Sequence, residues 1–510
     1  MKRIYQYILL LPFLVTSCKE QTTRITLLQI NDVYEIAPLE GGASGGMARV
    51  QTLHKKLRNE NPNTFLLHAG DFLNPSLLGT MTYNGEKIRG KQMVEIMNAM
   101  GFDLVTFGNH EFDLNEKDLQ KRLDESNFDW VSANVLHRKD SITGKFYKIR
   151  KHIKTFIPDT YILRAKDQNG KTRVKIGVVS VTLPVNKKDY VSYTDIYESA
   201  QQAYDKLKNQ TDFVIALTHL TKEQDKELLR RIPDIKLVIG GHEHTNMLIP
   251  VGNSSIAKAD ANARTAYVHR ITYHHRSKKV DITSELIPID STIEADNKVD
   301  ALVQKWQTVL DEKLHTVTGD PGKVIYRTGD NPLEARENHI RYEQTDFGQL
   351  VARAMLHGTG ADAAVVNSGS IRIDDRLQGA ITPLDVFRAL PYGGAVFVID
   401  IPGHFLIEIL DYGESRKGKG AYLQRAGITY DGKHKQWLVG KKPIENEKTY
   451  SLAITDFLLT GYDIPFLTHE NKNVLKVHEP NPGHTTFDIR KTVIDEFKRM
   501  NNLSSNTEKP

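Results

Sequence analysis

The sequence predicts an α/β protein built of two domains. In the first half of the chain, short aliphatic and β-branched runs alternate with amphipathic stretches, the order expected when strands and helices alternate. Several of these runs are apolar without interruption, as in strands buried on both faces of a sheet. The length of 510 residues exceeds the roughly 150 residues of one typical domain and leaves room for more than one core.

The first domain is predicted over residues 22–290. Short apolar runs bounded by Gly, Asn, Asp and His fit strands. These runs are ITLLQI, TFLLHA, LVTFG, WVSANV, VKIGVVSV, FVIALTH and IKLVIGG. The stretches between them carry apolar residues at helical spacing and are predicted to be helices: MARVQTLHKKLRNE, GKQMVEIMNAM, NEKDLQKRLDES and YESAQQAYDKLKNQ.

A long amphipathic helix over residues 291–318 is predicted to link the two domains. Its apolar positions between Val299 and Leu310 recur at helical spacing. Residues 319–500 are predicted to form a second α/β-like domain, with FGQLVARAM as a helix, ADAAVVNSGSIR as a strand followed by a loop, and AVFVIDIPG as another strand. The polar residues 501–510 are predicted to be a flexible tail.

Residues 1–18 have the layout of an export signal, with a basic start, a short apolar core and small residues before a cysteine. Cys18 is the sole cysteine, and VTSC resembles a bacterial lipobox, whose cysteine is lipidated after cleavage. This resemblance implies an exported lipoprotein, periplasmic or on the cell surface, with a lipid anchor in a membrane. A plain cleavable signal and a chance cysteine in an apolar leader are the alternatives.

The charged residues are balanced in number and spread along the chain. There are 68 Lys and Arg against 63 Asp and Glu, a formal net charge of +5, with no long block of one sign. This pattern is typical of a solvated surface and argues against a nucleic acid polymer as partner. A single cysteine excludes a disulfide within the chain. The sequence does not distinguish a monomer from a dimer.

Polar side chains follow several predicted strands at the point where each strand ends. In an open α/β sheet the carboxyl ends of the strands gather at one edge, so these side chains are expected to converge. Oxygen and nitrogen ligands of this kind suit two divalent metal ions that share one carboxylate, the arrangement used to hydrolyse phosphoesters. The six candidates are Asp32, Asp71, Asn109, His219, His242 and His244, with Asp71 as the natural bridge.

Each candidate also has an ordinary structural explanation. An Asp after a strand often caps a helix, an Asn–His step often forms a turn, and a single His at a strand end is often held by structural hydrogen bonds. The shared context favours the metal site, because every motif follows a predicted strand. His68, Glu111 and Glu243 lie near these motifs and are expected to support the site or the fold rather than to bind metal.

The order ND, GD, GNHE, TH and GHEH resembles that of the calcineurin-like metallophosphoesterases. Within them it resembles the two-domain 5'-nucleotidases, UDP-sugar hydrolases and 2',3'-cyclic-nucleotide phosphodiesterases, over nearly the whole chain. This implies a four-layer metallophosphoesterase sandwich followed by a second α/β (α+β) substrate-binding domain. It also implies a hydroxide between two ions that attacks phosphorus. One ion would be held by Asp32, Asp71 and His244, and the other by Asp71, Asn109, His219 and His242.

The resemblance further implies a catalytic pair. His110, directly after Asn109, matches the family's catalytic histidine, which donates to the phosphoryl oxygens as charge develops in the transition state. Asp113 would orient His110 and favour its imidazolium form. The alternative is a capped turn, in which Asp113 caps a helix that starts near Asn115.

One position departs from the family pattern. The family has D-x-H at the first motif, where the His binds the first ion, and here the third position is Tyr34. Three consequences are open: a phenolate ligand that favours Fe(III), as in the related purple acid phosphatases; a first site completed by water; or a weakened first site. Which ions the site binds, among Mn, Zn, Co and Fe, depends on which of these three consequences applies.

Segments of the second half resemble the family's substrate domain. VVNSGSIRID resembles its N-G-G-G-I-R signature, and RYEQTDFGQL resembles a segment with a second phosphate-binding Arg. A further family Arg falls on Glu337, next to Arg336. The family uses these positions for two phosphate-binding Arg, an Asn and an Asp at the nucleoside, and two aromatics that stack on the base. They map to Arg341, Asn367, Arg372, Tyr422, Phe457 and Asp463; without the resemblance, both aromatics would be expected in the core.

Together these expectations describe an exported dinuclear-metal phosphohydrolase acting on a nucleotide, a 5'-nucleotidase that releases phosphate and a nucleoside. A UDP-sugar hydrolase or a 2',3'-cyclic-nucleotide phosphodiesterase would have the same architecture. A hypothesis of another class, motivated by Tyr34, is a surface nucleotide-binding lipoprotein with a decayed first metal site. The resemblance also implies a hinge rotation that carries the nucleotide to the metals, with the helix region at 290–315 as the pivot.

Overall fold

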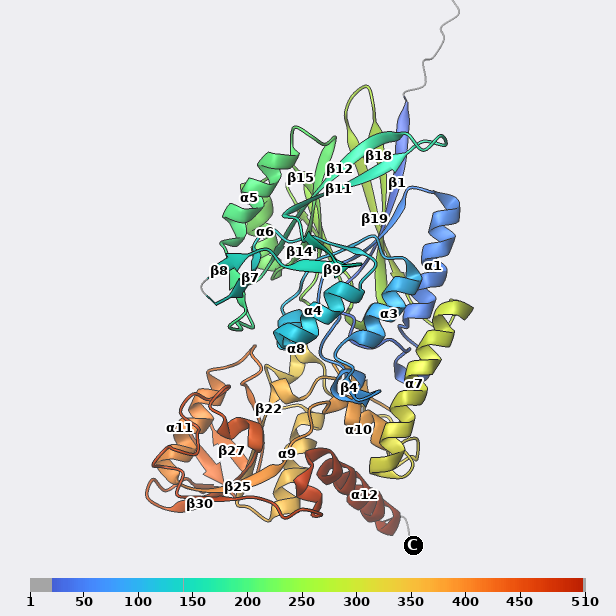
Figure 1. Ribbon diagram of the computed structural model, residues 1–510. Coiled ribbons are helices and arrows are strands. Elements are labelled where there is room, and N and C mark those ends of the chain that lie inside the picture. Colours follow the sequence, from blue (N-terminus) through green and yellow to red (C-terminus); the bar gives the residue numbers. More distant parts are fainter. Residues whose placement is uncertain (1–20, 141, 508–510) are drawn as a thin grey trace, which may run out of the picture.

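The computed structural model describes residues 21–140 and 142–507, so the predicted signal and Cys18 lie outside the described residues. The chain forms two domains that lie end to end, the first above the second in Figure 1. Helix α7 (Asn297–Thr318) runs along one side of both. In the part of the chain that the structure describes, no helix is both long and apolar enough to cross a membrane.

The first domain contains two six-stranded sheets. The first has the strand order β19-β18-β1-β2-β5-β6 and the second β11-β12-β14-β15-β17-β16. Strands β1, β2, β5 and β6 run parallel, as do β12, β14, β15 and β17, so their carboxyl ends meet at one edge of each sheet. The first sheet comprises β1 (Thr22–Ile30), β2 (Thr64–His68), β5 (Leu104–Val105), β6 (Asp129–Trp130), β18 (Thr265–His274) and β19 (Val280–Pro288). The second comprises β11 (Thr160–Lys166), β12 (Thr172–Thr182), β14 (Phe213–His219), β15 (Ile235–Gly240), β16 (Met247–Val251) and β17 (Ser254–Lys258).

Helices cover the outer face of each sheet, which gives four layers. The two sheets pack against each other through an apolar core that includes Leu27 and Leu67 of the first and Ile215 and Leu237 of the second. On the first sheet lie α1 (Met47–Glu60), α3 (Lys91–Met100) and α4 (Glu116–Glu125); on the second lie α5 (Ile196–Leu207) and α6 (Lys222–Arg231). The predicted four-layer sandwich is confirmed, and α1 spans the residues predicted for it.

Helix α7 begins later than the predicted linker and packs on the first domain. Asp296 is its N-cap and accepts a hydrogen bond from the Val299 backbone N–H over 3.2 Å. Trp306 is fully buried, and its indole N–H donates to Glu95 of α3 over 3.0 Å. The linker predicted from residue 291 is therefore helical from Asn297, where the cap lies.

The second domain is built on a five-stranded sheet with the order β26-β22-β30-β25-β31. Only β22 and β30 pair in parallel in this sheet, so the domain is α+β in character. Its strands are β22 (Ala363–Asn367), β25 (Val396–Pro402), β26 (Leu423–Ala426), β30 (Thr449–Thr455) and β31 (Lys476–His478). Its helices are α9 (Asp346–Thr359), α10 (Pro383–Ala389), α11 (Gly403–Glu414) and α12 (Ile489–Thr507), with α9 and α11 on opposite faces of the sheet.

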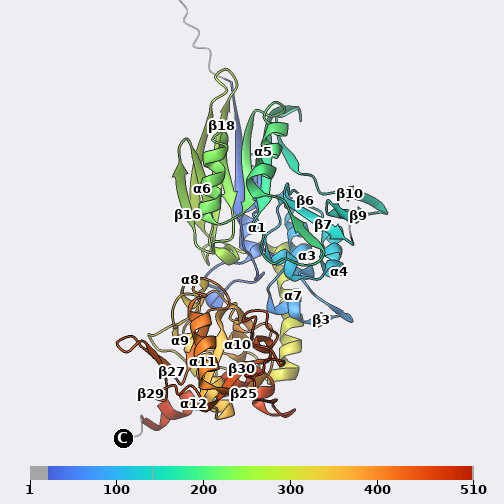
Figure 2. The ribbon, with the colours of Figure 1, turned by 90° about the vertical axis from the view of Figure 1, so that its left-hand side faces the viewer.

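Helix α12 continues to Thr507, past residue 501 where the sequence predicts a flexible tail. No Gly or Pro lies between residue 489 and the final Pro510, so the two residues that most strongly end a helix are absent from this segment. The remaining short elements connect the main layers, and the hairpin of β9 and β10 projects from the first domain in Figure 2. They are α2 (Leu77–Thr80), β3 (Thr82–Tyr83), β4 (Glu86–Lys87), β7 (Val135–Lys139), β8 (Ile142–Gly144), β9 (Tyr147–Arg150), β10 (Ile153–Phe156), β13 (Val191–Tyr193), β20 (Tyr326–Arg327), β21 (Leu333–Glu334), α8 (Glu337–Ile340), β23 (Arg376–Leu377), β24 (Ala380–Ile381), β27 (Ile428–Asp431), β28 (Gln436–Val439) and β29 (Lys442–Pro443).

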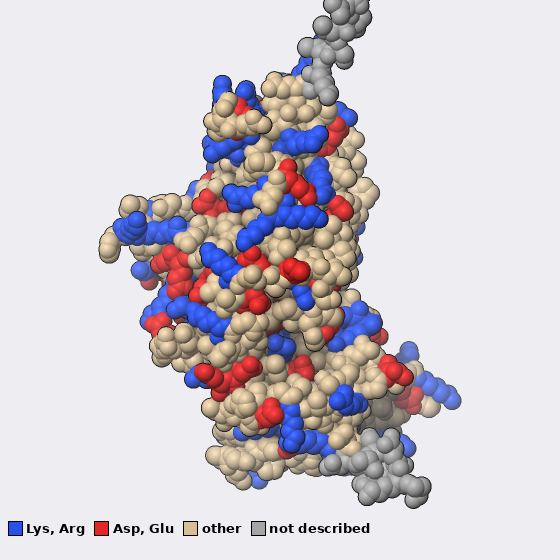
Figure 3. All heavy atoms as spheres, turned by 90° about the vertical axis from the view of Figure 1, so that its right-hand side faces the viewer, with Lys and Arg blue, Asp and Glu red and all other residues tan. Residues whose placement is uncertain are grey.

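Charged side chains of both signs are interspersed on the surface. On the face drawn in Figure 3, Lys and Arg alternate with Asp and Glu, and no large area carries one sign. This face agrees with the sequence pattern, in which charges of both signs are mixed along the chain.

Candidate metal centre and active site

Three of the predicted ligands meet at the carboxyl ends of strands from both sheets. Asp32 follows β1, Asp71 follows β2, and His219 ends β14; one ligand atom from each lies within 4.8 Å of the others. His219 Nε2 is 3.2 Å from Asp71 Oδ2 and 3.9 Å from Asp32 Oδ1. All three side chains are buried. The sandwich therefore brings together residues that lie up to 187 positions apart in the sequence.

At this edge of the sheets, two glycines allow the backbone to lie very close to the side chains of Asp71 and His219. A Cβ atom on Gly108 would lie 2.1 Å from Asp71 Oδ1, and one on Gly241 would lie 2.8 Å from His219 Nδ1. Asp32 and Asp71 adopt positive φ angles of 52° and 60°. Non-glycine residues rarely adopt this conformation, and it concentrates at functional sites.

Several buried ligand atoms have no hydrogen-bond partner among the described residues: Asp32 Oδ1, Asn109 Oδ1 and His219 Nε2. For Asp32 and His219 the other polar atom is fixed. Asp32 Oδ2 accepts from Asn31 Nδ2 over 2.8 Å and from the His242 backbone N–H over 2.9 Å. His219 Nδ1 donates to the Ala69 carbonyl over 2.7 Å, so Nε2 is the ring nitrogen that could bind a metal ion. Since buried polar atoms are normally paired, these atoms fit a metal ion at this position.

The charges of the site favour a cation. Burial raises the pKa of Asp32 from its usual range, so the protein neighbours alone do not compensate its charge. Burial lowers the pKa of His219, but Asp71 and Asp32 outweigh this effect and raise it to about 9. Burial lowers the pKa of His242 to about 3, so this imidazole stays neutral, the form in which histidine binds metals.

His244 and Tyr34 lie on one side of this cluster. His244 Nε2 is 3.6 Å from Asp32 Oδ1, and the ring of His242 lies 5.4 Å from that of His219 between ring centroids. The Tyr34 hydroxyl is 3.1 Å from His244 Nε2 and 3.3 Å from Asp71 Oδ2. The phenol oxygen is thus directed at the residues expected to hold the first ion.

The predicted catalytic pair is in contact. His110 Nδ1 lies 2.6 Å from Asp113 Oδ2, and the His110 backbone N–H donates to Asp71 Oδ1 over 2.7 Å. Asp113 also accepts from Asn186 Nδ2 over 2.9 Å. Helix α4 is capped by Asn115 and not by Asp113. The capped-turn alternative for Asp113 is therefore wrong, and its carboxylate is free to orient His110.

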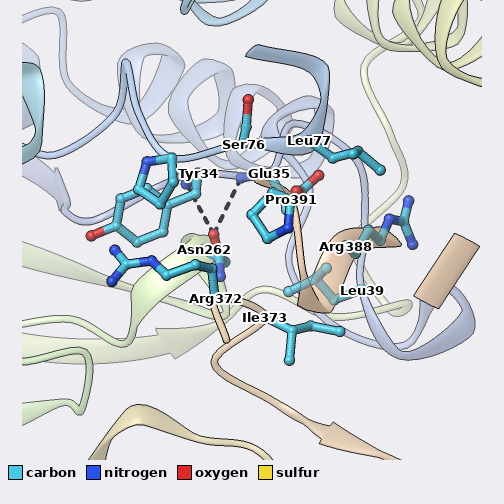
Figure 4. Close-up of a pocket in the computed structure, with 11 residues that line it drawn as sticks. Tyr34, Glu35, Leu39, Ser76, Leu77, Asn262, Arg372, Ile373, Arg388 and Pro391 are labelled. Atoms are coloured by element: carbon cyan, nitrogen blue, oxygen red, sulfur yellow. Dashed lines mark hydrogen bonds between the residues drawn. The ribbon is translucent and has the colours of Figure 1, made fainter. Parts of the chain in front are cut away.

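The second domain reaches the first at this pair. Arg372, in the loop after β22, places Nη2 3.1 Å from His110 Nε2. Tyr34 and Arg372 line one small pocket between the domains, in which Asn262 Oδ1 accepts from the Tyr34 and Glu35 backbone N–H groups (Figure 4). A guanidinium of the second domain and an imidazole of the first therefore lie within hydrogen-bond distance.

A cleft of about 1270 Å³ opens between the domains beside this contact. His242 and His244 line it from the first domain, and Arg341 and Glu337 line it from the second. Arg341 Nη1 pairs with Glu337 Oε1 at 2.6 Å. Glu337, which stands where the family has an Arg, therefore neutralises the charge of Arg341. Arg336 instead pairs with Glu334 at 2.6 Å.

Some of the residues expected to bind a nucleoside lie in contact, and one of the two expected aromatic rings is exposed. Asn367 Nδ2 donates to Asp463 Oδ2 over 2.7 Å. Phe457 is 39% exposed, whereas Tyr422 is only 2% exposed and its hydroxyl accepts from Gln344 Nε2 over 3.2 Å. The exposed ring beside Phe457 is Tyr462, 68% exposed, with ring centroids 6.0 Å apart. Sequence reasoning missed Tyr462, although an aromatic residue directly before the predicted ribose-binding Asp463 was a signal.

A buried lysine that sequence reasoning missed holds two of the ligand loops. Lys258, at the end of β17, is fully buried, and its Nζ donates to the carbonyls of Leu220 over 2.6 Å and Gly241 over 2.8 Å. It also pairs with Asp225 at 2.9 Å and with Glu243. These contacts fix the backbone next to His219 and His242. A lysine at the end of a buried strand was the available signal.

Glu111 has a similar role on the other side of the site. It is fully buried and accepts from the backbone N–H groups of Asp71 and Gly108, over 2.9 and 2.6 Å, and of Phe72 and Leu73, over 2.8 and 3.0 Å. Its carboxylate thereby ties the loop that carries Asp71 to the loop that carries Asn109. This position agrees with the supporting role expected for it.

Comparisons with known proteins follow the same division of the chain. Residues 25–246 match the family described as calcineurin-like phosphoesterase, and residues 324–469 match the 5'-nucleotidase C-terminal domain. A 5'-nucleotidase of Vibrio cholerae is 25% identical over 508 residues, which cover 87% of this chain and 86% of its own. A 5'-nucleotidase of Rattus norvegicus is 26% identical over 474 residues, which cover 82% and 78%.

Solved structures share the fold. The crystal structure of a 5'-nucleotidase precursor from Thermus thermophilus has a TM-score of 0.74 at 21% identity and covers 94% of this chain and 97% of its own. A sulfate thiohydrolase from the same organism has a TM-score of 0.65 at 16% identity, with coverage of 93% and 94%. At this identity the likeness concerns the fold alone, and activity has to be argued from the site.

Proposed function

Since this chain joins a calcineurin-like phosphoesterase domain to a 5'-nucleotidase C-terminal domain and is a phosphoric ester hydrolase, we propose that it is a dinuclear-metal 5'-nucleotidase. The observation that carries this proposal is the contact of Arg372 with His110, next to the cluster of Asp32, Asp71 and His219. Because the two domains meet there, the Arg372 guanidinium of the second domain lies beside a histidine and a candidate metal-binding cluster of the first.

Residues of the first domain would hold the ions and act on the phosphoryl group. Asp71 would contribute to both ions, Asp32 and His244 to the first, and Asn109, His219 and His242 to the second. When bound, two divalent ions supply an activated water and neutralise phosphoryl charge.

His110 and Arg372 would stabilise the charge that develops on the phosphoryl oxygens. Asp113 holds His110 Nδ1–H, so Nε2 faces the place where Arg372 now lies and, when protonated, can donate to a phosphoryl oxygen. Arg372 contributes a planar donor pair suited to the same phosphate.

Residues of the second domain would select a nucleotide. Phe457 offers an exposed face for a base, and Asp463 with Asn367 offers acceptors and donors for a ribose diol. Arg341 lines the cleft that leads to His242 and His244. Nucleotide sugars and 2',3'-cyclic nucleotides share the same base and ribose chemistry, so UDP-sugar hydrolysis and cyclic-nucleotide hydrolysis are the alternatives for this site.

Export with a lipid anchor at Cys18 is part of the proposal and rests on the sequence of residues 1–18. Metabolic labelling with a radioactive fatty acid tests it, because wild-type protein should take up label and Cys18→Ser should not. Label in both proteins, or in neither, contradicts the anchor.

The activity is tested by phosphate release from AMP, UDP-glucose and 2',3'-cyclic AMP. Protein stripped with EDTA is assayed alone and after addition of Mn²⁺, Co²⁺ or Zn²⁺; we expect metal-dependent turnover, with the largest kcat/KM for AMP. A larger kcat/KM for another member of the panel selects the corresponding alternative. Tight AMP binding without hydrolysis under every metal supports the nucleotide-binding lipoprotein instead.

A further inference from the structure

The side chain of His244 is held by both domains at once. Its Nε2 faces Tyr34 and Asp32 of the first domain, whereas its Nδ1 lies 2.7 Å from Asp374 Oδ2 of the second. An ionised carboxylate only accepts hydrogen bonds, so Nδ1 carries a proton and donates it to Asp374. Nε2 is then the nitrogen left to bind a metal ion.

Asp374 is itself firmly held. Its Oδ1 accepts from the Glu337 backbone N–H over 2.7 Å, and its carbonyl accepts from Arg264 Nη1 of the first domain over 3.2 Å. It is 9% exposed and has a φ of 47°, the same uncommon conformation as Asp32 and Asp71. A carboxylate in a strained backbone, fixed on one oxygen and directed at a histidine with the other, has the features of a functional position.

We propose that Asp374 is the positioning residue of His244 and that the second domain thereby completes the first metal site. The inference rests on the proposed dinuclear centre. A metal-binding histidine commonly donates its second ring N–H to a carboxylate, which fixes the ring and makes the other nitrogen a better ligand. Here that carboxylate comes from the opposite wall of the interdomain cleft.

The two metal sites then differ in their dependence on domain position. The second ion's expected ligands all belong to the first domain: Asp71, Asn109, His219 and His242. The first site gains its full affinity only while Asp374 contacts His244, when the domains are closed on each other. By linkage, an ion at the first site favours closure by the same factor as closure favours that ion.

Asp375 provides a matched control. Its Oδ2 pairs with Arg264 Nη2 at 3.0 Å, so it also joins the two domains, but through an arginine that binds no metal. Asp374 and Asp375 are neighbours in the same loop and carry the same charge. Their variants therefore separate an effect on His244 from a general weakening of the domain contact.

The test is isothermal titration of Mn²⁺ into EDTA-stripped full-length protein. Wild type is expected to bind two ions, and Asp374→Ala to bind one of them about 10- to 100-fold more weakly with the other unchanged. Asp375→Ala should keep both affinities. Asp374→Asn, which retains an acceptor oxygen for His244, should give an intermediate affinity, and it carries the test if the alanine variant does not fold.

Equal weakening in the Asp374 and Asp375 variants, or no weakening in the Asp374 variants, overturns the inference. Failure of wild-type protein to bind two ions contradicts the proposed dinuclear function instead, so the two failures are distinguishable.

Discussion

His110 contacts a predicted metal ligand, a carboxylate partner and the second domain at the same time. Its backbone donates to Asp71 over 2.7 Å, its Nδ1 lies 2.6 Å from Asp113, and its Nε2 lies 3.1 Å from Arg372. A histidine with this many fixed neighbours is preorganised, which is the condition under which one donor contributes strongly to transition-state stabilisation.

Replacement of His110 by Ala should lower kcat for AMP by about 10²- to 10³-fold, because the donor to the phosphoryl oxygens is lost. Mn²⁺ affinity, measured by titration, should change little, since the side chain is not an expected ligand. Steady-state kinetics at saturating Mn²⁺ give kcat. A variant that retains wild-type kcat would show that His110 has no part in the chemistry.

Variants of Tyr34 distinguish a phenolate ligand, a first site completed by water and a weakened first site. Tyr34→His restores D-x-H, and we expect it to bind Mn²⁺ at the first site at least about tenfold more tightly than wild type, because an imidazole replaces a phenol. Tyr34→Phe is the control that removes only the hydroxyl. A visible absorption band in Fe(III)-loaded wild type that disappears in Tyr34→Phe identifies a phenolate ligand; equal Mn²⁺ affinity in all three proteins contradicts a role for this position in metal binding.

At the scale of elements, the site depends on loops that follow strands and on the buried charges that hold those loops. Lys258 contacts backbone carbonyls next to His219 and His242, and Glu111 joins the loops of Asp71 and Asn109. The candidate ligands therefore owe their positions to residues that are not themselves expected to bind metal.

Replacement of Lys258 by Met should destabilise the first domain by about 3–5 kcal/mol, because Asp225 and Glu243 lose their buried cation. Urea denaturation in EDTA measures this without any contribution from metal. Lys226→Met, which breaks a surface ion pair with Glu223 on α6, the helix that also carries Asp225, is the control and should change stability little. Similar stability of both variants would mean that Lys258 is not an anchor.

Burial raises the pKa of Asp103, which accepts from the Leu66 backbone N–H over 2.8 Å, to about 6. A raised folded-state pKa contributes stability that is complete below the usual value of 3.8 and is lost as the pH rises through 6. Asp103→Asn keeps an acceptor without the charge. Its stability relative to wild type should therefore increase by about 2.5 kcal/mol between pH 4 and pH 8, at 1.36 kcal/mol per pKa unit; urea denaturation at both pH values with no such increase contradicts the assignment.

Most elements were predictable from the sequence, because each core strand and helix follows its own hydrophobic period. The runs ITLLQI and FVIALTH lie within β1 and β14, and α1 has the predicted bounds. Helix ends were less predictable: α7 begins at Asn297 because Asp296 caps it, and α12 continues into a polar segment that contains neither Gly nor Pro.

The residues of the candidate site also differ in how far the sequence predicts them. Asp32, Asp71 and His219 were predictable because strand ends carry them to one edge. The roles of Asp374 and Lys258 were not predictable, because they depend on which distant side chain or backbone group the tertiary fold places beside them.

At the scale of the whole molecule, the candidate active site exists only where the two domains meet. Arg372 and Asp374 of the second domain contact His110 and His244 of the first, and the cleft between the domains is lined from both sides. Helix α7 packs along the first domain and leads into the second, so it connects the two parts whose relative position determines these contacts (Figure 1).

The central claim is that a dinuclear centre in this cleft hydrolyses a nucleotide. It is tested most directly by phosphate release from AMP as Mn²⁺ is added stepwise to EDTA-stripped protein, with bound metal counted in the same samples. We predict no turnover without metal and full activity at two bound ions per chain. Turnover in the presence of EDTA, or full activity with fewer than two bound ions, would contradict the account.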